Sequence, residues 1–187
     1  MKRLPVVYSA AVATLAAACV ARAANLVLEA ESAVTNEAPM VTVSLAAPPP
    51  GIPAIEGASG NAYLEVPLGA GKTPKVKAGT ATFVVDIPVD GAYTVWLRSH
   101  WAGECSNTFL AQIDDHPPFL VGGDSTFRTW HWVKYPVSKL TPPPRIGKGR
   151  HTLRILHRED GVRLDQLLLT TEPRYVPVAA ERAGVSP

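Results

Sequence analysis

The stretch TATFVVDIPVDGAYTVWLRS, residues 80–99, decides the fold of this chain. Its first half alternates apolar and polar residues and stops at Pro88, which has no amide proton to donate to a strand ladder. Val89-Asp90-Gly91 follows as a turn, in which Gly91 can adopt a positive φ. Beyond the turn, residues 93–99 again carry apolar side chains at every second position. The stretch therefore predicts two β-strands joined by a tight connection.

Short alternating runs of this kind recur on both sides of residues 80–99. Proline and glycine are spread too evenly for amphipathic helices, and proline-rich connections interrupt the chain at 47–53 and 142–149. The hairpin-length turns between the runs indicate antiparallel sheets. We therefore expect an all-β fold, an antiparallel β-sandwich over residues 24–171, followed by a flexible tail at 172–187. The other expected strands are 25–31, 40–45, 61–66, 108–114, 130–137, 150–157 and 162–170.

The N-terminus has the pattern of a cleavable signal peptide over residues 1–23. Lys2 and Arg3 precede an apolar run at 4–20, and Ala21-Arg22-Ala23 has the small-x-small form of a cleavage site. The run is shorter and richer in alanine than the roughly 20 strongly apolar residues of a spanning helix. We expect export, to the periplasm or the medium. The alternatives are an N-terminal membrane anchor and a lipoprotein through Cys19, although Ala16 stands where a lipoprotein signal carries leucine.

Removal of residues 1–23 changes the charge and the cysteine content. Lys2, Arg3 and Arg22 leave with the segment, so 15 of the 18 basic residues remain against 16 acidic ones. This balance gives no electrostatic reason to expect nucleic acid or an anionic membrane as a partner, and no second apolar stretch predicts a membrane span. Cys105 is then the single cysteine, which excludes an intramolecular disulfide.

Seven short motifs give the chain a recognisable order. They are LEAE at 28–31, NAYLE at 61–65, GAYTVWLR at 91–98, WHW at 130–132, GRHTL at 149–153, REDG at 158–161 and LDQL at 164–167. Together they resemble carbohydrate-binding modules of the family 6 and family 35 type. The resemblance implies a galactose-binding-like jelly roll that binds a polysaccharide or glycan. Such modules commonly accompany glycoside hydrolases, and this chain has no catalytic domain, so a separately encoded hydrolase is an expected partner.

A structural calcium ion is the expected cofactor. Glu29 and Glu31 are two residues apart on an expected strand, so both carboxylates should leave the same face and repel each other. The resemblance implies a Ca²⁺ ion held by these first-strand acids together with Asp165 on the last strand, and carboxylate oxygens are the ligands that Ca²⁺ prefers. The alternative is solvated acids, or ion pairs with Arg154 or Arg158.

The tryptophans are the first candidates for sugar binding, because flat apolar rings stack on the C–H groups of pyranoses. Trp101 is expected in a loop near Glu104 and Asn107, which makes it the preferred stacking residue. Trp130 is the second candidate and shares a strand face with Trp132. We assign Trp132 and Trp96 to the core.

Polar candidates come from the expected loops and from one strand. Tyr63 shares a face with Glu65 and is expected to line the rim of a cleft. Asn107, Asp124 and Arg128 are candidates because loops at the end of a sandwich commonly carry binding residues.

We do not expect an enzyme. Glycosidase carboxylates face each other across roughly 5–10 Å, whereas Asp114-Asp115 and Glu159-Asp160 are neighbours in expected turns. Gly123-Asp124-Ser125 lacks the strand–helix elbow of an esterase, and the five histidines lack metal-ligand spacing. The expectation is non-catalytic carbohydrate binding. The alternatives are a structural or adhesive cell-surface sandwich that binds no sugar, and a small jelly-roll enzyme acting on polysaccharides.

Overall fold

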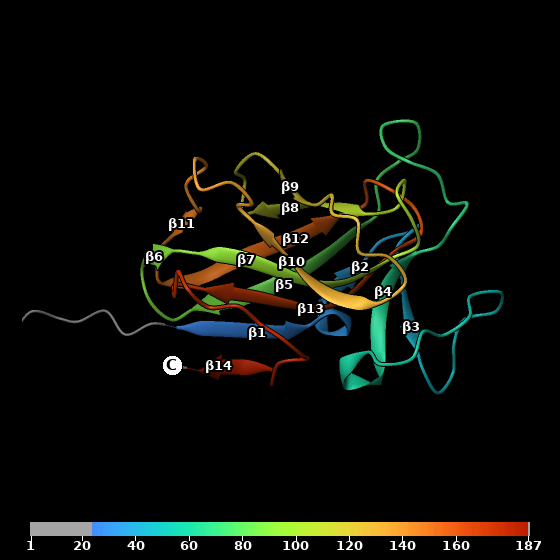
Figure 1. The fold of residues 1–187 in the computed structure, drawn as a ribbon, viewed down its shortest axis with the longest axis horizontal. Helices are drawn as coiled ribbons and strands as arrows, with labels where there is room; N and C mark the ends of the chain where they lie inside the picture. Colours follow the sequence, from blue (N-terminus) through green and yellow to red (C-terminus); the bar gives the residue numbers. More distant parts are fainter. Residues whose placement is uncertain (1–23, 187) are drawn as a thin grey trace, which may run out of the picture.

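The computed structural model describes residues 24–186 as two antiparallel sheets packed face to face (Figure 1). The predicted signal peptide and Cys19 lie outside the described residues. The all-β antiparallel sandwich expected from the sequence is confirmed. No helix in the described part of the chain is long and apolar enough to cross a membrane.

The large sheet carries the candidate functional site. Its main path runs from β10 through β7 and β13 to β1 and β14, and β4 and β3 extend it beyond β13. β13 pairs with β7 along one edge, while β4 and β1 share its other edge. The large sheet comprises β1 (Asn25–Glu29), β3 (Val41–Ser44), β4 (Ala62–Val66), β7 (Thr94–Trp101), β10 (Trp130–Tyr135), β13 (Val162–Thr170) and β14 (Gly184–Ser186).

The second sheet faces the large one across the core and has the order β2-β5-β12-β8-β9. A separate pair, β6 and β11, lies at one end of the sandwich, and the 3-10 turns η1 and η2 lie towards the other (Figure 1). The bounds are β2 (Thr35–Asn36), β5 (Thr80–Ile87), β6 (Gly91–Ala92), β8 (Thr108–Ile113), β9 (Phe119–Gly122), β11 (Arg145–Ile146), β12 (Gly149–Leu156), η1 (Ala30–Ser32) and η2 (Ser59–Asn61).

Residues 80–99 form the two predicted strands, but the two belong to opposite sheets. β5 pairs with β12 and β7 pairs with β13, so the turn at 88–92 crosses from one sheet to the other. The apolar positions of both strands point between the sheets: Phe83 and Leu97, for example, are 1% and 0% exposed. Burial of these alternating apolar side chains on two facing sheets supplies the core.

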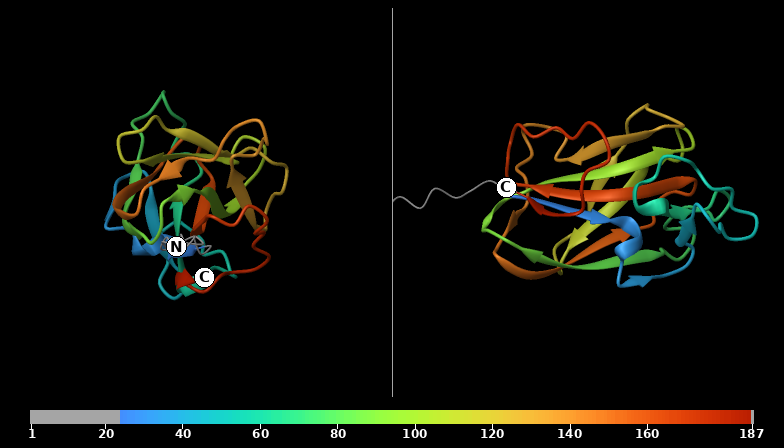
Figure 2. Two further views of the ribbon diagram at one scale, coloured as in Figure 1. Left: turned by 90° about the vertical axis from the view of Figure 1, so that its left-hand side faces the viewer. Right: turned by 90° about the horizontal axis from the view of Figure 1, so that it is seen from below.

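The outer face of the large sheet has two covers. The loop at residues 46–61, which follows β3 and ends with η2, lies over the end that carries β4. The C-terminal segment, residues 172–186, loops back over the same sheet before β14 pairs with β1 (Figure 2). We predicted that this segment would be a flexible tail, and the structure differs, because backbone and side-chain hydrogen bonds hold it against the sheet.

Candidate functional site

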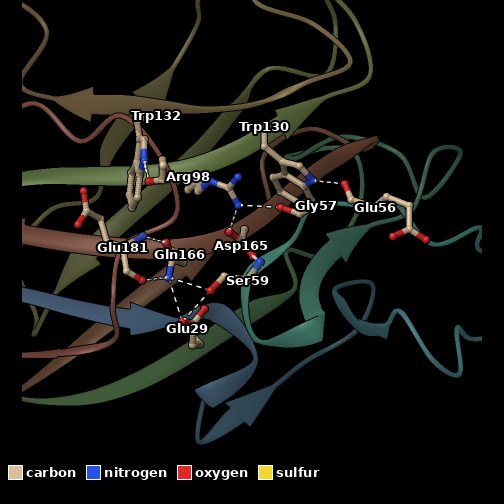
Figure 3. Close-up of polar contacts among 11 residues, drawn as sticks. Glu29, Glu56, Gly57, Ser59, Arg98, Trp130, Trp132, Asp165, Gln166 and Glu181 are labelled. Carbon is tan, nitrogen blue, oxygen red and sulfur yellow. Dashed lines mark hydrogen bonds and ion pairs between the residues drawn. The ribbon is translucent and has the colours of Figure 1, made fainter.

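The outer face of the large sheet brings two tryptophans and an arginine together. β10 pairs with β7 so that Trp130 lies opposite His100 and Trp132 opposite Arg98. Because side chains alternate along a strand, Trp130 and Trp132 leave the same face of β10. Figure 3 shows Arg98 between the two rings. We call Trp130, Arg98 and Trp132 the tryptophan strip.

Trp130 is half-buried and holds the 46–61 loop. Its indole Nε1 donates a 2.9 Å hydrogen bond to the carbonyl oxygen of Glu56. The ring meets Tyr63 and His100 edge-on, with centroid distances of 5.4 and 5.3 Å. The Arg98 guanidinium lies 5.6 Å from the Trp130 ring centroid, within the range of a cation–π contact. The ring orientation is therefore fixed from several directions.

Arg98 joins the strip to a buried acid. Its Nη1 donates to the carbonyl oxygen of Gly57 at 3.1 Å and forms an ion pair with Asp165. The Asp165 side chain is fully buried and also accepts a 2.7 Å hydrogen bond from the amide of Ser59. Burial raises the pKa of Asp165, and the charge and hydrogen bond of Arg98 oppose that rise. The ion pair and the Ser59 amide together fix the loop end over the sheet.

Trp132 and Gln166 hold the C-terminal segment through side-chain hydrogen bonds to its backbone, as Trp130 and Arg98 hold the 46–61 loop. The Trp132 indole Nε1 donates to the carbonyl oxygen of Ala179 at 2.8 Å. The Gln166 side-chain amide donates to the carbonyl oxygen of Glu181 at 2.7 Å and accepts from the Glu181 amide at 2.8 Å. The strip therefore lies between two chain segments, one anchored by Trp130 and the other by Trp132 (Figure 3).

A cavity of about 280 Å³ adjoins the strip along the edge strand β10. Trp132, Trp96, Lys134 and Asp124 are among its lining residues. Aromatic walls with a few charged groups at the rim are the usual composition of ligand sites. The cavity therefore places an aromatic wall and charged groups directly beside Trp132.

The prediction that Trp101 lies in an exposed loop is wrong. Trp101 is the last residue of β7 and is 0% exposed, because the strand continues two residues beyond its predicted end. The continued alternation turns the ring inward, against Phe109 and His131. Its Nε1 donates to Asp124 Oδ1 at 2.9 Å. Trp101 is a core residue and offers no stacking face.

The predicted rim position of Tyr63 is also wrong. Tyr63 is 0% exposed, and its hydroxyl accepts a hydrogen bond from the amide of Ile55 at 3.0 Å beneath the 46–61 loop. Asn107 is half-buried and connects two loops. Its backbone amide donates to the carboxylate of Glu159, and its side-chain amide donates to the carbonyl oxygen of Asp124. Arg128 is exposed in the 122–129 loop, with φ of 57°. Neither Asn107 nor Arg128 belongs to the strip.

The prediction that Trp96 is a core residue is confirmed, because Trp96 is buried in a cluster with Val27 and Leu168, although this cluster lies on the outer face of the large sheet. Trp132, which was also assigned to the core, is only half-buried and packs against this cluster together with Tyr175. The shared strand face of Trp130 and Trp132 is confirmed. Arg98 was missed as a site residue, although its place two residues after Trp96 on the same strand face is visible in the sequence.

A buried polar cluster lies beneath the 46–61 loop, beside Trp130. Arg163 forms a 2.9 Å ion pair with Glu65, whose side chain is 3% exposed. The Arg163 guanidinium also lies 3.3 Å from Nδ1 of His100, which accepts when neutral. Burial, followed by the charge of Arg163, lowers the pKa of His100 to about 4. Burial raises the pKa of Glu65, and the charge of Arg163 opposes that rise.

The predicted calcium ligands do come close together, although Glu31 lies in η1 and not on the strand. A Cβ added to Gly60 would lie 2.1 Å from Glu31 Oε1 and 3.7 Å from Cδ of Glu29. Oε2 of Glu29 and Oε2 of Glu31 are buried and have no hydrogen-bond partner among residues 24–186. Burial, with the negative charges of Glu29 and Asp165, raises the pKa of Glu31 to about 7.

The alternative ion pairs for these acids are not formed. Arg154 donates to the carbonyl oxygen of Asp114, and Arg158 pairs with Glu159. Asp165 pairs with Arg98, and residues 24–186 contain no group of three or more acidic, histidine or cysteine side chains already arranged to hold a metal. The two carboxylates with free oxygens fit a hard cation, and Asp165 is the third acid beside them.

The comparisons with known proteins show the fold. No protein-family model matches the sequence, and no curated protein matches it. Solved structures that do match share the jelly roll of carbohydrate-binding modules of families 35 and 6, which confirms the resemblance predicted from the motifs. At 12–14% identity, the likeness concerns the fold alone.

Three of these structures have the following measures. A native family 35 carbohydrate-binding module from Clostridium thermocellum has a TM-score of 0.54 and 13% identity, over 78% of this chain and 96% of that one. The C-terminal CBM6 of LamC from Zobellia galactanivorans has a TM-score of 0.51 and 12% identity, over 78% and 98%. The GH26-CBM35 β-(1,4)-mannanase of Podospora anserina has a TM-score of 0.57 and 14% identity, over 81% of this chain and 28% of the mannanase. The chain thus spans less than a third of that enzyme.

Proposed function

We propose that this protein is an exported, non-catalytic carbohydrate-binding module that binds a glycan chain at the tryptophan strip. The observation that carries the proposal is the pair of half-buried tryptophans, Trp130 and Trp132, on one face of the edge strand β10 with Arg98 between them. A rise of about 3.3 Å per residue separates the two ring positions by about 7 Å along the strand. One glycan chain lying along β10 could contact both rings.

The polar groups around the strip support the same function. Arg98 provides guanidinium donors, and the Glu56 and Glu181 side chains lie on opposite sides of the strip as acceptors (Figure 3). Stacking rings with nearby donors and acceptors are what a sugar needs, because each pyranose has apolar C–H faces and a rim of hydroxyls. The fold shared with carbohydrate-binding modules adds to this support.

A glycan array with residues 24–187, followed by titration of the best ligand, tests the proposal. Trp130→Ala and Trp132→Ala should each weaken binding by about 1–3 kcal/mol, which is roughly 5- to 150-fold. Val84→Ala, an exposed position on β5 in the other sheet, is the matched control and should bind normally. Binding to no glycan would favour the adhesive-scaffold alternative, and release of reducing ends from a polysaccharide panel would favour an enzyme.

We further propose a structural Ca²⁺ ion held by Glu29 and Glu31, with Asp165 as the third acid. The buried, unpartnered carboxylate oxygens of Glu29 and Glu31 within residues 24–186 support it. A bound cation would neutralise their mutual repulsion and connect the end of β1 to η2 and β13. Its role would be structural, because the ion would stabilise the folded chain beside the strip.

Export is also a proposal, and it rests on residues 1–23 alone. Intact mass of the protein recovered from the periplasm or medium should show a chain beginning near residue 24. A lipid-modified chain beginning at Cys19 would instead support the lipoprotein alternative. Co-purification from the producing cells would test for a separately encoded glycoside hydrolase as a partner.

A further inference from the structure

The C-terminal segment covers an aromatic surface that continues the tryptophan strip. Trp96 lies opposite Lys134, one outward position beyond the pair formed by Trp132 and Arg98. The three tryptophans thus follow one another along the sheet, over about 13 Å at the usual rise per residue. Val27 and Leu168 pack beside Trp96, and Tyr175 of the segment packs against them. We call Val27, Trp96 and Leu168 the masked face.

The C-terminal segment buries few of its own residues where it covers the masked face. All three residues of β14 are exposed, and among residues 172–186 only Pro177 is buried. A cavity of about 280 Å³ remains at the segment, lined by Val27, Tyr175 and Glu181 among others. A short, exposed strand at a sheet edge with few buried apolar contacts belongs to the least stable part of a fold.

The masked face also contains a polar group that the segment leaves without a partner. Trp96 is 7% exposed, and its indole Nε1 has no hydrogen-bond partner among the described residues 24–186. A buried N–H group without an acceptor is unfavourable, so an acceptor supplied by a ligand would stabilise it. The segment provides an acceptor to the neighbouring Trp132, through the carbonyl oxygen of Ala179, but provides none to Trp96.

We propose that the masked face is the second half of the glycan site, and that a long glycan chain displaces the C-terminal segment to reach it. The inference rests on the function proposed above. The ligand is a linear oligosaccharide long enough to extend from Trp130 past Trp132 to Trp96, whose hydroxyls replace the Ala179 carbonyl and supply the missing acceptor. A short oligosaccharide uses only the open strip and leaves the segment in place.

A reversible covalent lock on the segment tests this inference. Asn25 of β1 and Ser186 of β14 are directly paired, at a distance from the strip, so Asn25→Cys with Ser186→Cys places two thiols on adjacent strands. The background carries Cys105→Ser, because Cys105 is exposed. The same background without the two new cysteines is the matched control, and intact mass verifies disulfide formation.

Long oligosaccharides should bind the reduced protein at least tenfold more tightly than the oxidised protein, while short ones bind both equally. Equal affinity of long chains for the two states would overturn the inference and leave the proposed function standing. Binding of glycans by neither state would overturn the proposed function and the inference together.

Hydrogen exchange of the unaltered chain gives a second test that needs no substitution. The amides of Glu181 and of β14 should exchange faster when a long oligosaccharide is bound, because displacement breaks the Gln166 and β1 hydrogen bonds. Exchange that is unchanged or slower in the complex would contradict displacement.

Discussion

Replacement of Arg163 by methionine should strongly destabilise the fold. Methionine keeps most of the length of the side chain but removes the charge that faces Glu65 at 2.9 Å. Glu65 is 3% exposed, so the remaining carboxylate would be a buried charge without its partner. Removal of one member of a buried ion pair costs about 3–5 kcal/mol. For a domain of this size, 1 kcal/mol corresponds to roughly 2–4 °C in Tm, so we expect a decrease of about 6–20 °C.

The destabilisation by Arg163→Met should also depend on pH, in a direction that the pKa of Glu65 determines. Burial raises the pKa of Glu65, and Arg163 opposes that rise, so the Glu65 pKa should be higher still in Arg163→Met. A carboxyl whose folded pKa exceeds its unfolded pKa binds a proton more readily when folded. The cost of the substitution should therefore be largest at neutral pH and decrease as the solution is acidified through the raised pKa.

Urea unfolding at several pH values measures these effects directly. The double variant Glu65→Gln with Arg163→Met has no unpaired charge and should recover most of the lost stability, with a coupling of at least 1 kcal/mol between the two sites. A loss below about 1 kcal/mol for Arg163→Met, or one independent of pH, would refute the reasoning. So would purely additive effects of the two substitutions.

Three further predictions follow from the site. His100 should remove stability as the pH falls from about 6.5 to about 4, because the unfolded imidazole gains a proton in that window and the folded one does not; this contribution is at most about 3 kcal/mol. The raised pKa of Glu31 acts in the opposite direction, so the contribution of His100 is measured as the difference between the urea-derived stability profiles of the wild type and His100→Gln. EGTA should lower the Tm by several degrees relative to excess Ca²⁺, because a ligand present at 100 times its Kd contributes about 2.7 kcal/mol to the free energy of unfolding. Glu31→Gln should abolish this difference in Tm. An unchanged wild-type Tm would contradict the calcium site. Trp130→Phe should bind the glycan more tightly than Trp130→Ala, because phenylalanine keeps a stacking ring. Equal affinities of the two variants, measured by calorimetry, would show that ring stacking at position 130 does not contribute to binding.

The strands were predictable because their signal is local. Alternation at 80–87 and 149–156 specifies one buried face for each strand, and the sandwich buries those faces together. Residues 162–170 form a central strand that is buried on both faces. The sheet to which each strand belongs is not a local property. β5 and β7 read as neighbours across a tight turn, yet the chain crosses between sheets there, because each strand pairs with a distant partner.

The site was predicted less completely than the fold. Trp130 and its shared face with Trp132 follow from the period of two along a strand. Trp101 was misplaced because the end of a strand is the least certain part of a pattern, and two extra residues moved the ring from a loop into the core. The C-terminal segment has no strand pattern of its own. Its position depends on side-chain donors outside the segment: Gln166 on the preceding strand, and Trp132, which is far away in the sequence.

Titration of residues 24–187 with the best ligand from a glycan array, alongside Trp130→Ala and Trp132→Ala, tests the central claim most directly. The account predicts saturable binding of a glycan by the unaltered protein, about 5- to 150-fold weaker binding by each variant, and no change for Val84→Ala. Normal binding by both tryptophan variants, with their folds intact by near-ultraviolet circular dichroism, would place the glycan elsewhere and contradict a site at the tryptophan strip.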